Sequence, residues 1–273
     1  MWLKADLHVH TCQGPESIVR WTPREVIDLA AQAGYRILSI TDHDRRTYDS
    51  SLACYARERG IVLIPGVEAT IEGRHVLLYN FSHPPDALRT LGDIRRRKGP
   101  HSLVIAPHPF FPGPTSLRNR LVKNLDLFDA VEYCHFHTAW LDYNRAAQRL
   151  AQSKNLPLVG NSDAHLPCQF GTTYSLVEAE PTLEGVLGAI RAGQVRVVSR
   201  PLKTSELFAV GLVLMVGAIF RPESWPVRAL EAGLGVSTIG ASTGAMALPL
   251  AERLRGLPQE LELSNTRGLW SSS

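Results

Sequence analysis

Short apolar runs alternate with segments whose apolar residues recur at helical spacing. The runs predict strands at Leu3–Val9, Ile37–Thr41, Ile61–Pro65, His75–Phe81, Leu103–Ala106, Ala130–Tyr133, Leu156–Gly160 and Tyr174–Val177. The amphipathic segments predict helices at Pro23–Ala33, Ser50–Arg59, Leu141–Lys154 and Thr182–Ala192, with Thr22 as the N-cap of the first. The chain is therefore expected to be an α/β protein.

The order of these elements favours a barrel. Alternating strands and helices imply parallel pairing through right-handed crossovers, and about seven or eight strands favour a closed sheet over an open one. The short turn-like sequence EGR directly precedes His75–Phe81, so we expect a local hairpin between the third strand region and this strand. The prediction is a distorted, TIM-like (β/α)₇ barrel.

The pattern changes after Arg200. Leu207–Phe220 is apolar and carries no charge, and Leu234–Leu250 is rich in small residues. We expect a barrel over residues 1–200 and an apolar C-terminal extension of unknown role over residues 201–273. Because the first block is shorter than the roughly 20 residues of a membrane span, packed soluble structure is favoured over membrane association.

Composition narrows the functional classes. A chain of 273 residues with 44% hydrophobic residues can build a hydrophobic core that is stable without disulfide bonds. The net charge of +3 is too small to indicate a stable nucleic-acid partner, and the basic run Arg95–Lys98 is either a solvated helix end or a guide for anionic substrates. The four cysteines form no CxxC pair, and the residues before Asp6 leave no room for a signal peptide, so a cytoplasmic location is expected. The oligomeric state is left open.

Histidines and acids gather where the predicted strands end. His8 and His10 are two residues apart on the first strand, so their side chains point to the same face. In a parallel barrel the carboxyl ends of the strands meet at one mouth, where active sites are built. The side chains expected to meet there are His8, His10, Asp42, His43, Glu68, His108, His135, His137, Asp163 and His165.

This set of side chains predicts a metal centre. Imidazoles and carboxylates suit Zn²⁺, Mn²⁺ or Fe²⁺, and eight or more of them exceed the needs of one tetrahedral ion. We therefore expect two or three divalent ions.

The motifs DLHVHT, ITDHD, PGVEA, APHPF and NSDAH occur in this order over roughly residues 4 to 200. In this respect the chain resembles the PHP family, the polymerase and histidinol phosphatase domain, in its small stand-alone phosphoesterase form. The resemblance implies a distorted (β/α)₇ barrel whose metal cluster hydrolyses phosphate esters. It also implies a set of metal ligands, with Glu68 bridging two ions: His8, His10, His43, Glu68, His108, Asp163 and His165.

Two further ligand positions depart from the common family pattern. Many members have an aspartate in the turn after the first motif, where this chain reads TCQGPES. Glu16 is the candidate ligand there, and the alternative is that it faces solvent. After the sixth strand we favour His135 as a ligand, with His137 as a group that contacts substrate or supports a ligand. His75 resembles a histidine near the mouth in small PHP proteins and is a candidate substrate-binding residue. The alternative is a surface hairpin histidine. Arg118 is a candidate phosphate-binding residue, and the alternative is that its charge is simply solvated.

The expected activity is hydrolysis of a phosphate ester by a metal-activated water. Asp163, His165 and His43 are the candidates for proton transfer. The substrate class is a small phosphorylated molecule or a short nucleotide, and the choice between phosphatase and phosphodiesterase stays open. Two alternatives are an amidohydrolase-like hydrolase and a noncatalytic metal-binding barrel.

Overall fold

The computed structural model describes residues 1–16, 18–208, 210–211 and 261–264. The apolar block at Leu234–Leu250 and most of Leu207–Phe220 lie outside these residues. Within them, no helix combines the length and the apolar character that a membrane crossing requires.

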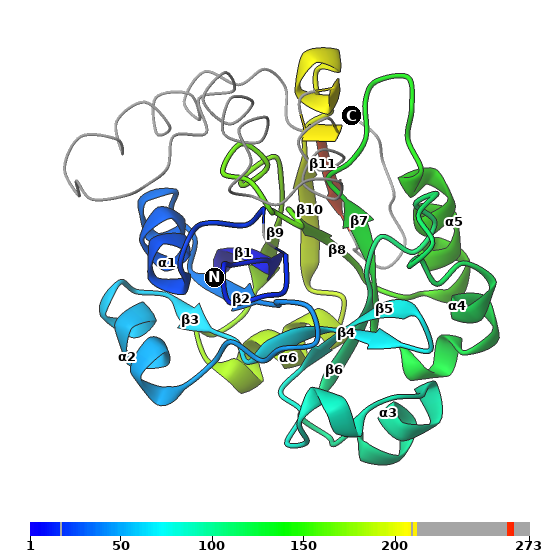
Figure 1. Cartoon of the computed structure of the whole chain (residues 1–273). Coiled ribbons are helices and arrows are strands. Elements are labelled where there is room, and N and C mark those ends of the chain that lie inside the picture. The colour runs from blue at the N-terminus through cyan, green and yellow to red at the C-terminus, as the bar shows by residue number, and fades with distance from the viewer. Residues whose placement is uncertain (17, 209, 212–260, 265–273) are drawn as a thin grey trace.

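The described residues form eleven strands in two sheets (Figure 1). The strands of the first sheet are β1 (Trp2–Val9), β2 (Ile37–Ile40), β3 (Val62–Leu63), β9 (Thr173–Glu178), β10 (Val195–Ser199) and β11 (Leu261–Ser264). Those of the second are β4 (Gly66–Ile71), β5 (Arg74–Tyr79), β6 (Leu103–Ala106), β7 (Ala130–Cys134) and β8 (Leu158–Asn161). The first sheet has the order β11-β10-β9-β1-β2-β3, and the second runs from β4 to β8 in sequence order. The predicted mixed α/β class is confirmed.

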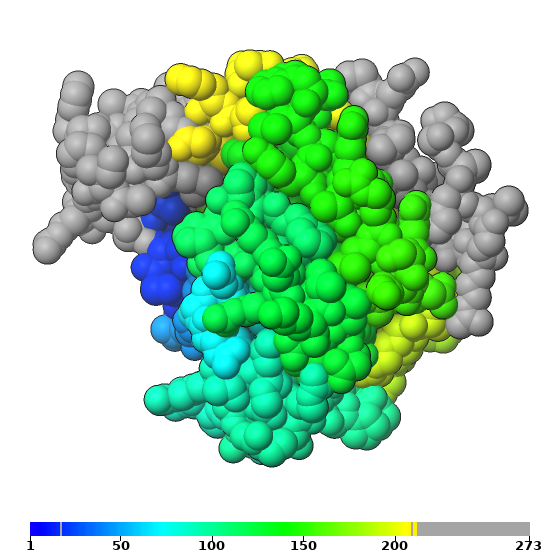
Figure 2. All heavy atoms as spheres, turned by 90° about the vertical axis from the view of Figure 1, so that its right-hand side faces the viewer, coloured from blue at the N-terminus to red at the C-terminus, as the bar shows by residue number. Residues whose placement is uncertain are grey.

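Helices cover the outer faces of these sheets. They are α1 (Pro23–Gln32), α2 (Ser50–Glu58), α3 (Leu91–Arg97), α4 (Asn119–Lys123), α5 (Asn144–Lys154) and α6 (Leu183–Arg191), with 3-10 turns η1 (Pro85–Ala87) and η2 (Leu125–Leu127). The helices α1 and α2 lie near β2 and β3, α5 packs on β7, and α6 packs near β9. The segment that contains α3, α4 and α5 makes up most of the face in Figure 2.

Local sequence signals explain several element ends. Thr22 caps α1 through a capping box with Glu25, as predicted from the sequence. The expected hairpin is confirmed as β4 paired antiparallel with β5, from Gly66 opposite Tyr79 to Ile71 opposite Arg74. Its turn residues Glu72 and Gly73 both have positive φ (50° and 73°), the conformation of tight hairpin turns.

The predicted closed barrel is not confirmed, because the described strands hydrogen-bond as two separate sheets. One edge of β1 pairs with parallel β2, and its other edge pairs with antiparallel β9 over Trp2 to Ala5, which leaves no free edge there for β8. Isolated bridges join the two sheets at the strand ends: Val9 with Ala164, and His43 with Glu68. The sheets therefore meet where the polar residues gather.

Alternation along β1 separates apolar from polar side chains. Ala5 and Leu7 belong to a fully buried apolar cluster that also includes residues of α6. Asp6 and His8 occupy the alternate positions, and both are fully buried. The strand thus supports the apolar core with one set of side chains and the polar site with the other.

Candidate metal centre

One buried carboxylate, that of Glu68, lies at the centre of the polar site. Two histidine nitrogens lie near its Oε1, namely His75 Nδ1 at 2.8 Å and His108 Nε2 at 3.1 Å. Three lie near its Oε2, namely His8 Nε2 at 3.1 Å, His43 Nδ1 at 3.1 Å and His10 Nε2 at 3.2 Å. We call Glu68 and these five histidines the Glu68 cluster. Its members come from β1, β4 and β5 and from the segments that follow β1, β2 and β6.

The backbone brings Glu68 to this position through a close approach of β4 to β2. Glu68 N donates to Thr41 O at 3.2 Å, beside the bridge between His43 and Glu68. Gly66 permits this approach, because a Cβ there would collide with the Ser39 side chain. The glycine of the PGVEA motif therefore has a steric role.

Asp163 and His165 complete the centre from the segment after β8. Asp163 Oδ1 lies 3.1 Å from His10 Nε2 and 3.2 Å from His8 Nε2. The His165 ring stacks on the His10 ring with centroids 4.1 Å apart. Asp163 and His108 have positive φ (45° and 28°), a region that residues other than glycine rarely occupy and that is common at functional sites.

The donor atoms fit divalent metal ions. They form three groups, each with its atoms within 4.8 Å of one another: His8, His10, Glu68 and Asp163; His10, His43 and His165; and His43, Glu68 and His75. His8 Nε2 and His10 Nε2 lie only 3.2 Å apart, and both face carboxylate oxygens. His10 Nδ1, His135 Nδ1 and Glu16 Oε2 are buried without a hydrogen-bond partner among the described residues. A cation is the natural partner for convergent nitrogen lone pairs and carboxylates.

The electrostatics favour the metal-binding protonation states of the acids. Burial alone would raise the pKa of Glu68 and of Asp163, but nearby histidines, His8 first, hold both well below the usual range. Burial likewise opposes charging of His10, yet its hydrogen bonds to Asp163 and Glu68 raise its pKa to about 9. In His165 and His43 burial dominates and lowers the pKa to about 3 and about 4. These two imidazoles are therefore neutral near pH 7.

Glu132 is a site residue that the sequence analysis missed. It is fully buried on β7, and its Oε1 lies 2.8 Å from His8 Nδ1 and accepts from Asn161 Nδ2 at 2.9 Å. Its Oε2 accepts from His108 N at 2.7 Å. A carboxylate on the far nitrogen of a candidate ligand fixes the tautomer and orientation of that ring. The available sequence signal was a lone acid inside the apolar strand AVEYC.

Glu16 lies beside the centre and Asp42 points away from it. Glu16 Oε1 is 3.3 Å from His43 Nε2, and burial raises the pKa of its carboxyl. Asp42 instead accepts hydrogen bonds from Thr11 N at 2.5 Å, Thr11 Oγ1 at 2.7 Å and Thr47 Oγ1 at 2.5 Å. Asp42 therefore ties together the two loops that follow β1 and β2.

The remaining candidates have different surroundings. His135 is buried, and its Nε2 lies 3.0 Å from Gln169 Nε2, at the edge of the centre. His137 lies apart, with its Nε2 2.9 Å from Ser199 Oγ. Arg118 is exposed and donates to the carbonyls of Phe111 (3.4 Å) and Gly113 (3.5 Å). The structure thus places His135 in the lining of the pocket at the centre, where it contacts Gln169, and brings neither His137 nor the Arg118 guanidinium there.

A pocket of about 310 Å³ opens onto the centre. Its lining includes Glu68, Asp163 and candidate histidines, and also an aromatic wall with Phe111 and Phe136. These two rings meet edge to face with centroids 5.4 Å apart, and the Tyr143 ring packs on Phe111 at 5.8 Å. The pocket therefore combines a charged wall with an aromatic one.

Three sequence comparisons bear on the family. A family model described as PHP-associated matches residues 142–195. An uncharacterized protein of Methanocaldococcus jannaschii is 28% identical over 166 residues, which cover 57% of this chain and 94% of that protein. A 3′,5′-nucleoside bisphosphate phosphatase of Chromobacterium violaceum is 38% identical over 73 residues, which cover 26% of this chain but only 25% of that enzyme.

Two solved structures resemble the fold. PsfC from Pseudomonas syringae has a TM-score of 0.51 at 18% identity, over 81% of this chain and 98% of PsfC. An amidohydrolase from Chromobacterium violaceum has a TM-score of 0.50 at 18% identity, over 74% of this chain and 99% of that chain. At such identities the likeness concerns the fold alone. The family-model match over residues 142–195, the local similarity to the bisphosphate phosphatase and the order of the motifs agree in relating the chain to PHP-type metal-dependent hydrolases.

Proposed function

We propose that this protein hydrolyses the phosphate ester of a small molecule or a short nucleotide with the help of two or three divalent metal ions. The observation that carries the proposal is the Glu68 carboxylate, which contacts five histidines from both sheets at 2.8 to 3.2 Å. The proposed ligands are His8, His10, Glu16, His43, Glu68, His108, His135, Asp163 and His165.

Divalent ions bound there would neutralise charge on the phosphoryl oxygens and acidify the attacking water. The protein's own contribution is orientation and proton handling. Glu132 orients His8 and His108, while Glu68 and Asp163 remain ionised. His43, Asp163 and His165 border the pocket and are the proposed proton-transfer groups. His43 and His165 are neutral near pH 7, which is also the protonation state that metal binding requires.

The aromatic wall of the pocket supports a substrate with an apolar leaving group. Phe111 and Phe136 line the same pocket as the acids, and we infer that they contact the alcohol part of an ester whose phosphate faces Glu68. Aromatic contacts of this kind favour planar groups such as a nucleobase or an aryl ring. His75 borders the same pocket and contacts Glu68, which supports its proposed role in substrate binding.

A substrate panel tests the proposal. Purified protein supplied with Mn²⁺, Zn²⁺ or Fe²⁺ is assayed on phosphate monoesters, phosphodiesters and, as controls, carboxamides. The proposal expects phosphoester hydrolysis that chelation abolishes and one of these metals restores. Hydrolysis of amides alone would favour the amidohydrolase alternative. Stable metal binding without any hydrolysis would favour a noncatalytic metal-binding protein.

We also propose that residues 1–200 form the catalytic unit and that residues 201–273 are an extension outside it. The position of every proposed ligand between His8 and His165 supports this boundary. The extension also contributes β11, which pairs antiparallel with β10. A variant that ends near Leu202 should keep its metal and its activity. A folded, metal-loaded variant that has lost hydrolysis would mean that the extension contributes to the site.

A further inference from the structure

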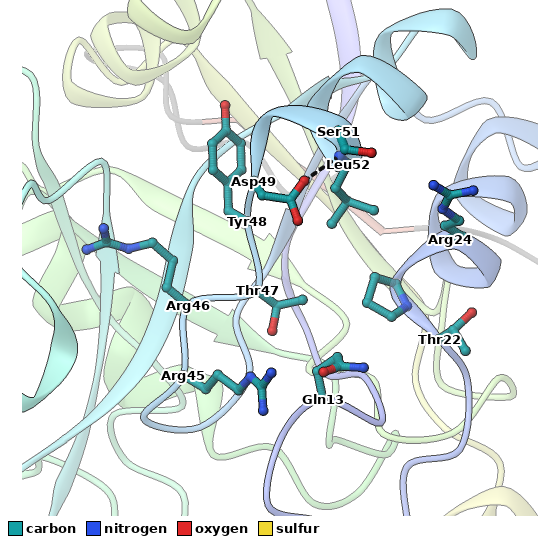
Figure 3. Close-up of a pocket in the computed structure, with 11 residues that line it drawn as sticks. Gln13, Thr22, Arg24, Arg45, Arg46, Thr47, Tyr48, Asp49, Ser51 and Leu52 are labelled. Atoms are coloured by element: carbon teal, nitrogen blue, oxygen red, sulfur yellow. Dashed lines mark hydrogen bonds between the residues drawn. The ribbon is translucent and has the colours of Figure 1, made fainter.

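A second pocket, of about 510 Å³, lies between the first turns of α1 and α2 and the loop that follows β2 (Figure 3). Its lining includes Arg24, Arg45, Arg46, Asp49 and the hydroxyl residues Thr47 and Ser51. None of its lining residues borders the pocket at the metal centre. It is therefore a separate cavity, and the proposed hydrolysis gives it no role.

The charge of this pocket is unbalanced. Three arginines line it against one carboxylate, that of Asp49, and this carboxylate caps α2 by accepting from Leu52 N at 2.8 Å. Nearby acids are also engaged, because Asp42 accepts from Thr11 and Thr47 and Glu25 accepts from Thr22 N at 2.6 Å. The lining thus has a net positive charge.

The three arginines differ in how many contacts their guanidinium groups already make with the protein. The Arg46 guanidinium donates to His83 O at 2.5 Å, and Figure 3 shows it pointing away from the other lining residues. Arg24 lies over the Tyr55 ring at 4.7 Å, which leaves its hydrogen-bond donors open. Arg45 is exposed and forms no side-chain hydrogen bond or ion pair with any described residue. Arg24 and Arg45 are therefore the two guanidinium groups available to a bound anion.

The backbone adds to this preference for anions. Both α1 and α2 begin at the pocket, and their amino-terminal turns carry partial positive charge. Guanidinium groups bind phosphate through paired, charge-assisted hydrogen bonds. A cavity of about 510 Å³ falls within the size range of small-molecule sites, so it can hold more than a lone inorganic ion.

We propose that this pocket binds a phosphorylated small molecule, with Arg24 and Arg45 contacting its anionic groups from different sides of the pocket. The inference does not depend on hydrolysis at the metal centre. The pocket is connected to that centre through Asp42, which accepts from Thr47 on the pocket side and from Thr11, the neighbour of His10.

The test is calorimetric titration of the full-length protein with pyrophosphate as the probe. Arg45→Gln and Arg24→Gln should each weaken binding about tenfold, the loss expected for one charge-assisted contact. The matched control is Arg57→Gln, which removes the same charge from the last turn of α2 and should bind as the unaltered protein does. Circular dichroism and metal content should be equal in all four proteins.

A fifth protein, Glu68→Gln, separates this pocket from the metal centre. It should still bind pyrophosphate, and its binding should still depend on Arg45 in the double variant. The proposal is overturned if the unaltered protein does not bind pyrophosphate, if the Arg24 and Arg45 variants bind like Arg57→Gln, or if Glu68→Gln alone abolishes binding. If Glu68→Gln loses hydrolysis but still binds pyrophosphate, the phosphate site is supported independently of the function of the metal centre.

The origin of the phosphate is resolved by kinetics on Arg45→Gln. An increased KM for a bisphosphate ester, with the KM for the matching monophosphate unchanged, would mean that the pocket holds a second phosphate of the substrate. Unchanged KM values for both, together with weakened pyrophosphate binding, would mean that the pocket holds a separate ligand. Either result supports a phosphate site.

Discussion

Buried histidines occur in two very different surroundings in this fold. In the Glu68 cluster, five imidazoles converge on one carboxylate, and Asp163 adds a second acid. His137 is also buried, but its Nε2 faces the Ser199 hydroxyl at 2.9 Å, and that hydroxyl lies 2.6 Å from Thr173 Oγ1. Burial pushes the pKa of His137 down, so it is a neutral ring in a neutral hydrogen-bond chain.

The comparison shows that burial alone does not identify a functional histidine. The His137 Nε2 has a neutral partner, the Ser199 hydroxyl. The Glu68 cluster contains nitrogens that face one another at 3.2 Å and ionised acids held by histidines. Convergence on carboxylates is therefore the feature that separates a metal centre from a structural histidine, and mutations can test this distinction.

The largest effect is expected from Glu68→Gln. Loss of the central charge should remove most of the bound metal and lower hydrolysis by at least about 100-fold, because the proposed role of this carboxylate is to bridge two ions. Asp42→Asn is the matched control, because Asp42 is as deeply buried but contacts threonines instead of the cluster. Metal analysis of the two variants checks the prediction, and equal metal content in both would contradict the bridging role.

Glu132→Gln should have the next largest effect. The amide can still contact His8 and the backbone of His108, so the fold should persist, but the negative charge that orients the His8 ring is lost. Metal affinity should fall about 10- to 100-fold, the usual cost of altering such a supporting group. A competition titration with a chelating dye measures this, and unchanged affinity would reduce Glu132 to a packing role.

A smaller effect is expected from Phe136→Leu on the apolar wall. Aromatic contacts contribute about 0.5 to 1.5 kcal/mol beyond area burial, so kcat/KM for aryl phosphates should fall about 2- to 10-fold. Alkyl phosphates should be hydrolysed as before, and metal content should not change. An equal loss on both kinds of ester would argue against a leaving-group contact at Phe136.

The smallest effect on the metal is expected from His137→Leu. Its removal leaves the Ser199 hydroxyl without one partner, so the free energy of unfolding should fall by about 1 to 3 kcal/mol. Metal content and kcat should stay the same. Denaturant unfolding and elemental analysis check the two halves of this prediction. A folded variant with less metal would indicate that His137 is a ligand, and a raised KM would indicate that it contacts substrate.

Much of the candidate site could be predicted from local patterns. The strand period places His8 and His10 on one face, and strand–helix alternation brings the segments after β1, β2, β6 and β8 to the same mouth. Glu132 could not be assigned in this way, because a lone acid in an apolar strand does not indicate which distant ring it contacts. The sequence favoured His135 over His137 as a ligand but could not settle the choice, because the backbone turns after β7 and ends the alternation.

The fold itself was predicted in part. The hairpin and the N-cap at Thr22 follow from short-range signals, and both are present. Closure of the barrel depends on which strand occupies each edge of β1, and the antiparallel approach of β9 is a long-range outcome that no local pattern encodes. The pairing of β11 with β10 is long-range in the same sense, since more than 60 residues of chain separate the two strands.

The most direct measurement is elemental analysis of the purified protein, coupled to phosphoester hydrolysis before chelation, after chelation and after return of each metal. Protein grown with ample Mn²⁺, Fe²⁺ and Zn²⁺ should contain two or three transition-metal ions per chain, because the convergent ligands exceed the needs of one ion. Hydrolysis should disappear with the metal and return with it. A stoichiometry of zero or one, or hydrolysis that survives complete removal of metal, would contradict the account.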